Sequence, residues 1–146
     1  MTWWKAQGYN EEKGSTLANA ARRKYNGLGA NGRAQGNCVG IVRQVINDVN
    51  HTNYKRFGQA RNIGHEYLCN DPNFKKIVVD MSQLKASDIP PGAIVLYPSG
   101  YAGGPLSYCG HGEIAGGNGF GYSDVKTTLL SNHGKRRNPC EIWIPV

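Results

Sequence analysis

The stretch QGNCVGIVRQVIND, residues 35–48, joins a glycine-rich segment to an apolar helix and places a single cysteine at the junction. After Cys38, apolar residues recur at spacings of three and four, at Val39, Ile41, Val42, Val45, Ile46 and Val49. Arg43, Gln44, Asn47 and Asp48 fall on the opposite face. The pattern therefore predicts a helix that begins at Cys38 and ends near Val49.

The rest of the chain contains further helix signals and then strand signals. We expect a helix over residues 16–25, capped by Ser15, and another near residues 63–70. The segment at residues 74–84 reads as a strand or a linker. Strands are expected in AIVLY (93–97), HGEIAGG (111–117), GFGYSDV (119–125) and EIWIPV (141–146). Helices followed by an antiparallel meander of four or more strands indicate an α+β fold.

Length and charge limit the kind of molecule. With 146 residues, the chain is expected to form a single domain over residues 1–146. Its formal net charge of +7 favours anionic partners such as nucleic acid, anionic lipid or an acidic cell-wall polymer. No apolar run approaches the ~20 residues that span a bilayer. The first fifteen residues, MTWWKAQGYNEEKGS, lack the apolar core of a secretory signal, so we expect a protein made in the cytoplasm.

Cys38 occupies a favourable position for a nucleophile. Free backbone N–H groups and the helix dipole favour a thiolate at a helix N-terminus, and the same N–H groups can hold an oxyanion. A lone cysteine before an apolar helix is, however, more often a core residue. A histidine that can exchange a proton with the thiol would favour catalysis.

Four histidines are candidates for that base: His51, His65, His111 and His133. His51 lies at the far end of the predicted helix, roughly 20 Å from Cys38 at 1.5 Å per residue. His65 and His133 have polar surroundings typical of a surface, whereas His111 begins a strand and is flanked by glycines. We therefore prefer His111.

A third group should orient the imidazole, and two acidic residues could do so. Asp124 ends the next strand candidate, which would lie beside His111 in a hairpin. Glu113 is the alternative, because it is two residues from His111 and thus on the same face of the strand.

Four segments together resemble the NlpC/P60 and CHAP cysteine peptidases and amidases. GNCVGIVRQVIND (36–48) resembles their nucleophile helix, and SQLKASDIPPGAIVLYPSG (82–100) is similar to the strand before their catalytic histidine. CGHGEIAGG (109–117) is similar to the histidine strand, and GFGYSD (119–124) to the strand with the third polar residue. The resemblance implies a papain-like core in which Cys38 is the nucleophile, His111 the base and Asp124 the orienting residue.

The chain also departs from the family pattern. Ala93 stands where the family usually has an aspartate, and Gly112 replaces a branched residue. The segment at residues 98–110 is longer than a simple hairpin, and Cys109 within it could form a disulfide with Cys69 or Cys140.

The resemblance also implies a function. Such enzymes hydrolyse an amide bond in the stem peptides or cross-links of peptidoglycan. The chain looks most like the type VI secretion amidase effectors, antibacterial toxins that act in the periplasm of a target bacterium and are neutralised by an immunity protein. A phage lysin would share several traits. Substrate-binding roles are expected for Gln35, Asn37, Glu113 and Tyr122, and we expect no cofactor, metal or nucleic-acid partner.

Two other interpretations remain open. A non-enzymatic module for cell wall or nucleic acid would use mixed aromatic and basic fragments such as TWWK (2–5) and NYKRF (53–57). A zinc site could use Cys109, His111, His133 and Cys140, although these spacings are not those of the usual zinc fingers.

Overall fold

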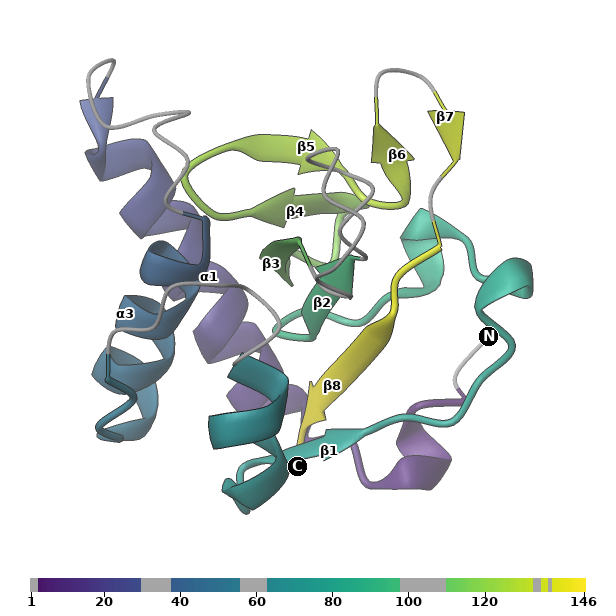
Figure 1. Cartoon of the computed structure of the whole chain (residues 1–146), viewed down its shortest axis with the longest axis horizontal. Coiled ribbons are helices and arrows are strands. Elements are labelled where there is room, and N and C mark those ends of the chain that lie inside the picture. The colour runs from purple at the N-terminus through teal and green to yellow at the C-terminus, as the bar shows by residue number, and fades with distance from the viewer. Residues whose placement is uncertain (1–2, 30–37, 56–62, 98–109, 133–134, 137) are drawn as a thin grey trace.

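The computed structural model describes residues 3–29, 38–55, 63–97, 110–132, 135–136 and 138–146 (Figure 1). In this part of the chain, two α-helices pack on a six-stranded antiparallel sheet. Helix α1 spans Glu11–Gly27 and helix α3 spans Cys38–Asn50. The α+β class and the antiparallel sheet that the sequence predicts are therefore confirmed.

Helix α3 agrees with its predicted bounds, whereas α1 begins earlier than expected. Asn10, rather than Ser15, is the N-cap of α1, and its side chain accepts a hydrogen bond of 3.0 Å from the backbone N–H of Lys13. Glu11 and Glu12 occupy the first turn, where negative charge complements the helix dipole. The helix therefore begins more than a turn before the start that a cap at Ser15 predicted.

Several short helical turns connect the larger elements. The helix expected near residues 63–70 is instead a π-helical turn at Ile63–Tyr67 followed by a 3-10 turn at Leu68–Asn70. Further 3-10 turns lie at Lys5–Gln7, Met81–Gln83 and Ala86–Asp88.

The sheet follows the order β1-β8-β2-β3-β4-β5. Its strands are β1 (Phe74–Lys76), β2 (Ile94–Tyr97), β3 (His111–Ala115), β4 (Phe120–Tyr122), β5 (Lys126–Thr128) and β8 (Glu141–Pro145). Strands β2, β3 and β4 form an antiparallel meander as predicted, and β5, which was not predicted, continues it. The last strand departs from it, because β8 returns to pair with both β1 and β2. Strands β6 (Ser131–Asn132) and β7 (Lys135–Arg136) form a separate pair.

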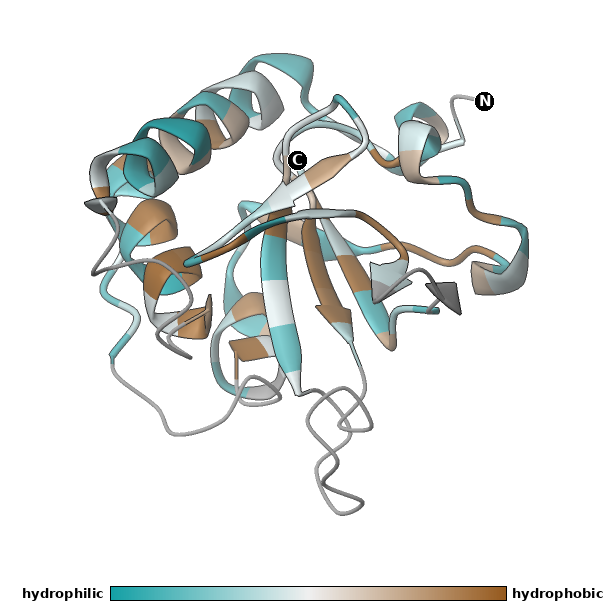
Figure 2. Cartoon of the chain, turned by 90° about the horizontal axis from the view of Figure 1, so that it is seen from above, coloured by the Kyte–Doolittle hydropathy of each residue, from teal (hydrophilic) through white to brown (hydrophobic). Residues whose placement is uncertain are grey.

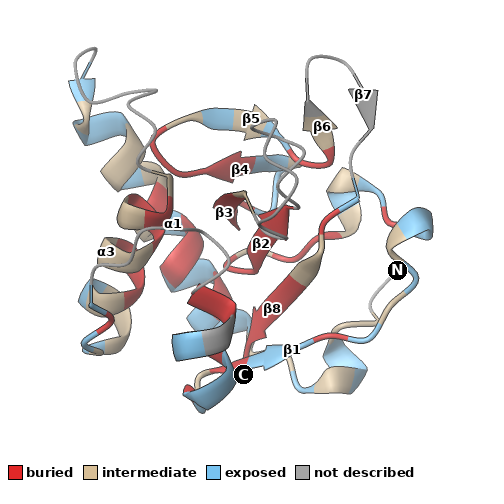
Figure 3. Cartoon of the chain, viewed as in Figure 1, coloured by how far each residue is buried: buried red, intermediate tan, exposed pale blue. Residues whose placement is uncertain are grey.

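Both faces of the sheet are covered, and the two central strands β2 and β3 are buried throughout (Figure 3). The two helices lie along one side of the sheet (Figure 2) and pack on Ile94, Leu96 and Ile114. The other face carries Val95, Tyr97 and Ala115, with Leu84, Ile89, Leu129 and Leu130 packed against it.

Strand periodicity assigns the residues of β3 to these two faces. Ile114 belongs to the helix-side core and Ala115 to the opposite core. Because side chains alternate along a strand, His111 and Glu113 share the face of Ala115. The candidate base and one candidate acidic partner therefore start from the same side of the same strand.

Candidate active site

Cys38 is the first residue of α3 and carries a partly buried free thiol. The helix packs on β3, and the neighbouring Val39 fixes the contact. A Cβ placed on Gly112 would lie 3.5 Å from Val39 Cγ2, an ordinary contact distance, so the helix and the strand lie directly against each other there. The start of α3 thus lies against the start of β3, where His111 begins the strand.

His111 is buried, with 6% of its surface exposed, and it forms a side-chain hydrogen bond with Cys38. In the sheet it pairs with Tyr97 of β2, and their ring centroids are 5.7 Å apart. The two residues that the sequence selects as nucleophile and base therefore meet in the structure.

Glu113 lies beside this imidazole. Its Oε2 lies 3.5 Å from Nε2 of His111, and only 1% of its surface is exposed. Oε1 accepts a hydrogen bond of 2.8 Å from the Tyr97 hydroxyl, and Oε2 accepts one of 2.8 Å from Thr127 Oγ1. Both oxygens of this buried carboxylate therefore accept a hydrogen bond from a hydroxyl group.

The electrostatics of the site favour a protonated imidazole. Burial by itself would lower the pKa of His111, because desolvation penalises the charged form. The hydrogen bonds with Cys38 and Glu113, together with the negative charges on these two groups, outweigh burial and raise the pKa of His111 from 6.5 to about 10. At neutral pH the imidazolium form therefore dominates.

A glycine allows Glu113 to reach this position. The Glu113 carboxylate extends across β4 toward Thr127 of β5, and Gly121 of β4 lies beneath it. A Cβ on Gly121 would overlap the carboxylate and Cγ of Glu113. Gly121 pairs with Thr127 in the sheet, so the absent side chain opens a direct path from β3 to β5.

The other predicted site residues have different positions. Asp124 is buried at 3% exposure, and its Oδ1 accepts a bond of 3.3 Å from Ser123 Oγ. Tyr122 is buried in the helix-side core, where its ring meets that of Tyr25 and its hydroxyl accepts a bond of 3.2 Å from Asn118. Gln35 and Asn37 lie outside the described residues.

Sequence reasoning missed Tyr97 and Thr127. Tyr97 was identified only as the last residue of the AIVLY strand, and no strand was predicted at Thr127. The pairing Tyr97↔His111 could have identified the tyrosine once the hairpin register was known. Thr127 lies two strands away from β3, so strand alternation alone does not select it.

The cysteines weigh against the zinc interpretation. Cys140 is disulfide-bonded, so it has no free thiolate to offer a metal. Cys69 is an exposed free thiol and is not the partner of that bond. The other cysteine and the histidine of the zinc hypothesis, Cys109 and His133, lie outside the described residues. Among the described residues, no group of three or more His, Cys, Asp or Glu side chains could hold a metal ion.

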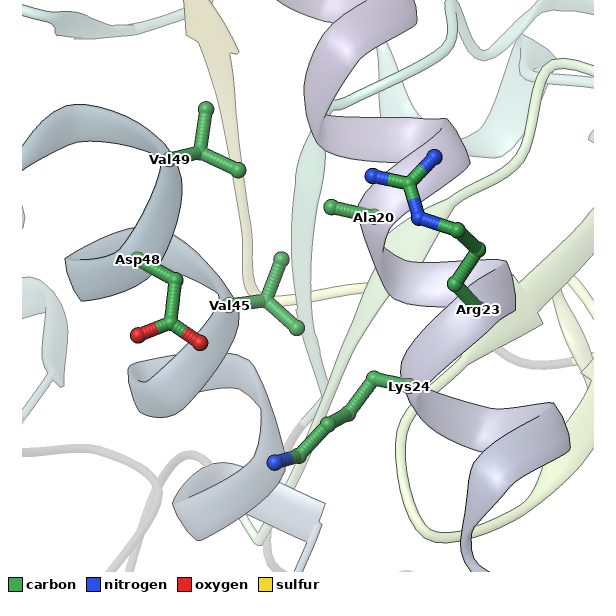
Figure 4. Close-up of a pocket in the computed structure, with 6 residues that line it drawn as sticks. All are labelled: Ala20, Arg23, Lys24, Val45, Asp48 and Val49. Carbon is green, nitrogen blue, oxygen red and sulfur yellow. The ribbon is translucent and has the colours of Figure 1, made fainter.

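A hollow also lies between the two helices (Figure 4). Val45, Asp48 and Val49 of α3 line it, together with Ala20, Arg23 and Lys24 of α1. Lys24 extends across it toward α3. Val45 is seven residues after Cys38, or about 10 Å along the helix, so this hollow is separate from the Cys38–His111 pair.

Comparisons with protein-family models, with curated proteins and with solved structures find no match for this chain. Within its described residues, no helix is both long and apolar enough to cross a membrane.

Proposed function

We propose that this protein is a cysteine-dependent amide hydrolase with a papain-like core, acting on the peptide part of peptidoglycan. The observation that carries the proposal is the hydrogen bond between Cys38, at the start of α3, and His111, with Glu113 on the other side of the imidazole. A nucleophile, a base and an orienting acid in contact are the minimal parts of such a site.

The first half of the reaction forms a thioester. The raised pKa of His111 favours a thiolate–imidazolium pair with Cys38. The thiolate attacks the carbonyl carbon of the scissile amide, so a C–S bond forms and the oxygen becomes an oxyanion. The free N–H groups at the start of α3 stabilise that charge. His111 then donates its proton to the amide nitrogen as the C–N bond breaks.

The second half releases the acid product. A water molecule takes the place of the departed amine, and the now neutral His111 accepts a proton from it. The hydroxide attacks the thioester carbonyl, the C–S bond breaks and the carboxylic acid product leaves, losing its proton to the solvent. The thiolate–imidazolium pair is restored, so the cycle needs no external cofactor.

We assign the orienting role to Glu113 in preference to Asp124. The support is the 3.5 Å approach of Glu113 Oε2 to His111 Nε2. This contact leaves Nδ1 as the ring nitrogen that meets the thiol. The assignment predicts that Glu113→Gln lowers kcat more than Asp124→Asn does, with both measured in folded protein. The reverse ranking would return the role to Asp124.

The choice of peptidoglycan rests on the resemblance to NlpC/P60 and CHAP enzymes and on charge. The net charge of +7 suits a substrate whose stem peptides carry carboxylates. The same resemblance supports a role as an antibacterial effector that acts in the periplasm of a target cell and has a cognate immunity protein.

The test compares two cysteine variants on purified peptidoglycan. Cys38→Ala removes the proposed nucleophile, whereas Cys69→Ala removes the exposed free thiol and serves as the matched control. Muropeptides are separated by chromatography and weighed by mass spectrometry. We expect new products from the wild type and from Cys69→Ala, and none from Cys38→Ala.

The product masses identify the bond that is cut. Equal products from Cys38→Ala would exclude the thiol mechanism. If all three proteins leave the muropeptides unchanged, peptidoglycan is not the substrate, and the non-enzymatic binding module becomes the better hypothesis.

A further inference from the structure

We propose that the hydroxyl groups of Tyr97 and Thr127 are positioning groups, which hold the Glu113 carboxylate in one orientation with Oε2 directed at His111. The inference rests on the proposed function for its role in catalysis. Neither hydroxyl is assigned to contact substrate, so both act through Glu113 and His111.

The direction of the Tyr97 hydrogen bond is fixed by its second partner. The backbone N–H of Leu130 donates to the Tyr97 hydroxyl oxygen at 3.1 Å. An N–H can only donate, so the hydroxyl oxygen must accept from it and its one hydrogen is left for Glu113 Oε1 at 2.8 Å. The backbone before β6 thus sets where one oxygen of Glu113 lies.

Thr127 fixes the other oxygen. Its Oγ1 donates to Glu113 Oε2 at 2.8 Å, and this is the same oxygen that lies 3.5 Å from His111 Nε2. With Oε1 held by β2 and Oε2 held by β5, the carboxylate cannot rotate without breaking both bonds. Gly121 lies beneath the carboxylate, which occupies the space that a side chain at this position would fill.

These hydroxyls have an electrostatic consequence for the imidazole. Glu113 is 1% exposed, so protein donors must replace the water that would stabilise its charge. Removing a donor makes the anionic form less favourable and frees the carboxylate to turn away from His111. In either case the interaction with Glu113 that favours the protonated form of His111 becomes weaker.

The test is the titration of His111 itself, followed by NMR on histidine-labelled protein. The His111 signal is identified as the one missing from His111→Gln. Thr127→Val keeps the shape of the side chain and removes the hydroxyl. In Thr127→Val we expect the midpoint of the His111 titration to fall by at least about one pH unit. This corresponds to a tenfold lower affinity of the imidazole for the proton. Thr127→Ser restores the hydroxyl and should return the midpoint to that of the wild type.

Two further variants separate positioning from general effects. Thr128→Val makes the same chemical change one residue along β5, at an exposed position, and should leave the midpoint unchanged. Tyr97→Phe should lower the midpoint, as Thr127→Val does. Tyr9→Phe removes a different tyrosine hydroxyl, which donates to the Pro91 carbonyl at 2.8 Å, and serves as its control.

The outcomes distinguish this inference from the proposed function. Unchanged His111 midpoints in Thr127→Val and Tyr97→Phe would overturn the inference, whether or not the protein cuts peptidoglycan. Lower midpoints in a protein that leaves peptidoglycan intact would support the inference and refute the substrate. Where the wild type is active, Thr127→Val should lower kcat with little change in KM, because the hydroxyl is not assigned to bind substrate.

Discussion

Replacing Glu113 by glutamine should reduce the loss of stability that we expect for this protein between pH 6.5 and about pH 10. In the wild type, His111 has a pKa near 10 when folded, against 6.5 as its ordinary value. Below pH 6.5 the imidazole is protonated in both states, and its stabilising contribution is fully present. Between the two values the folded state binds a proton that the unfolded state has lost, so stability falls as the pH rises.

The size of that fall follows from the two pKa values. One pH unit of difference corresponds to 1.36 kcal/mol, so the interval from 6.5 to about 10 corresponds to at most about 5 kcal/mol. Glu113 supplies both a hydrogen bond and a negative charge to this shift. Glutamine has nearly the same volume and can still accept from the Tyr97 hydroxyl, but it carries no charge. We therefore expect Glu113→Gln to at least halve the fall.

The measurement is urea unfolding of both proteins at pH 6.5, 8 and 10, with the free energy of unfolding extrapolated to water. Glu66→Gln removes a carboxylate at an exposed position and is the matched control, expected to keep the wild-type slope. The other groups that titrate in this range are common to all three proteins, so they cancel in the comparison. The same slope in Glu113→Gln as in the wild type would refute the coupling of His111 to Glu113.

Three other predictions concern packing and caps. Gly121→Ala puts a Cβ against the Glu113 carboxylate and should cost about 1–3 kcal/mol of stability, measured by urea unfolding. It should also lower the midpoint of the His111 titration. A variant as stable as the wild type would contradict the close approach of Gly121 to the carboxylate. Asn10→Ala removes the cap of α1 and should cost about 1 kcal/mol without changing the His111 titration, which thermal unfolding and NMR can check together. Tyr54→Phe removes a buried hydroxyl that donates a hydrogen bond of 2.5 Å to Asp71. We expect it to cost about 1.5–3 kcal/mol in the same unfolding assay, whereas an unchanged stability would mean that the bond is replaced.

The sequence was most informative where periodicity is strong. The three-and-four spacing after Cys38 predicted α3 almost to the residue, because its apolar stripe faces a core. The four strands β2, β3, β4 and β8 were predicted from short strand-forming segments, the first of them an apolar run after a Pro-Pro-Gly turn. The order of the sheet was not predictable in this way, since β8 pairs with β1 and β2 through contacts distant in sequence.

Local polar contacts explain the main errors in the fold. The sequence prediction placed the cap of α1 at Ser15, whereas Asn10 caps the helix, so the prediction missed its first residues. Near residues 63–70 the sequence predicted a helix, but the backbone forms two short helical turns of different pitch, a π-helical turn and a 3-10 turn. Ile63 and Leu68 are both buried there.

Some contacts of the candidate site follow from strand β3 alone, and others depend on the neighbouring strands of the sheet. His111 and Glu113 share a face of β3 by alternation alone, so their proximity was within reach of the sequence. The choice between Glu113 and Asp124 could not be made from the sequence, because it depends on how far the Glu113 side chain can extend. Gly121, on the next strand, removes the side chain that would block it, and Thr127, one strand further, supplies the hydrogen bond that holds it. Glu113 is two residues after His111 on β3, and Gly121, which pairs with Ala115 from the adjacent strand, leaves the space in which the Glu113 carboxylate reaches the imidazole.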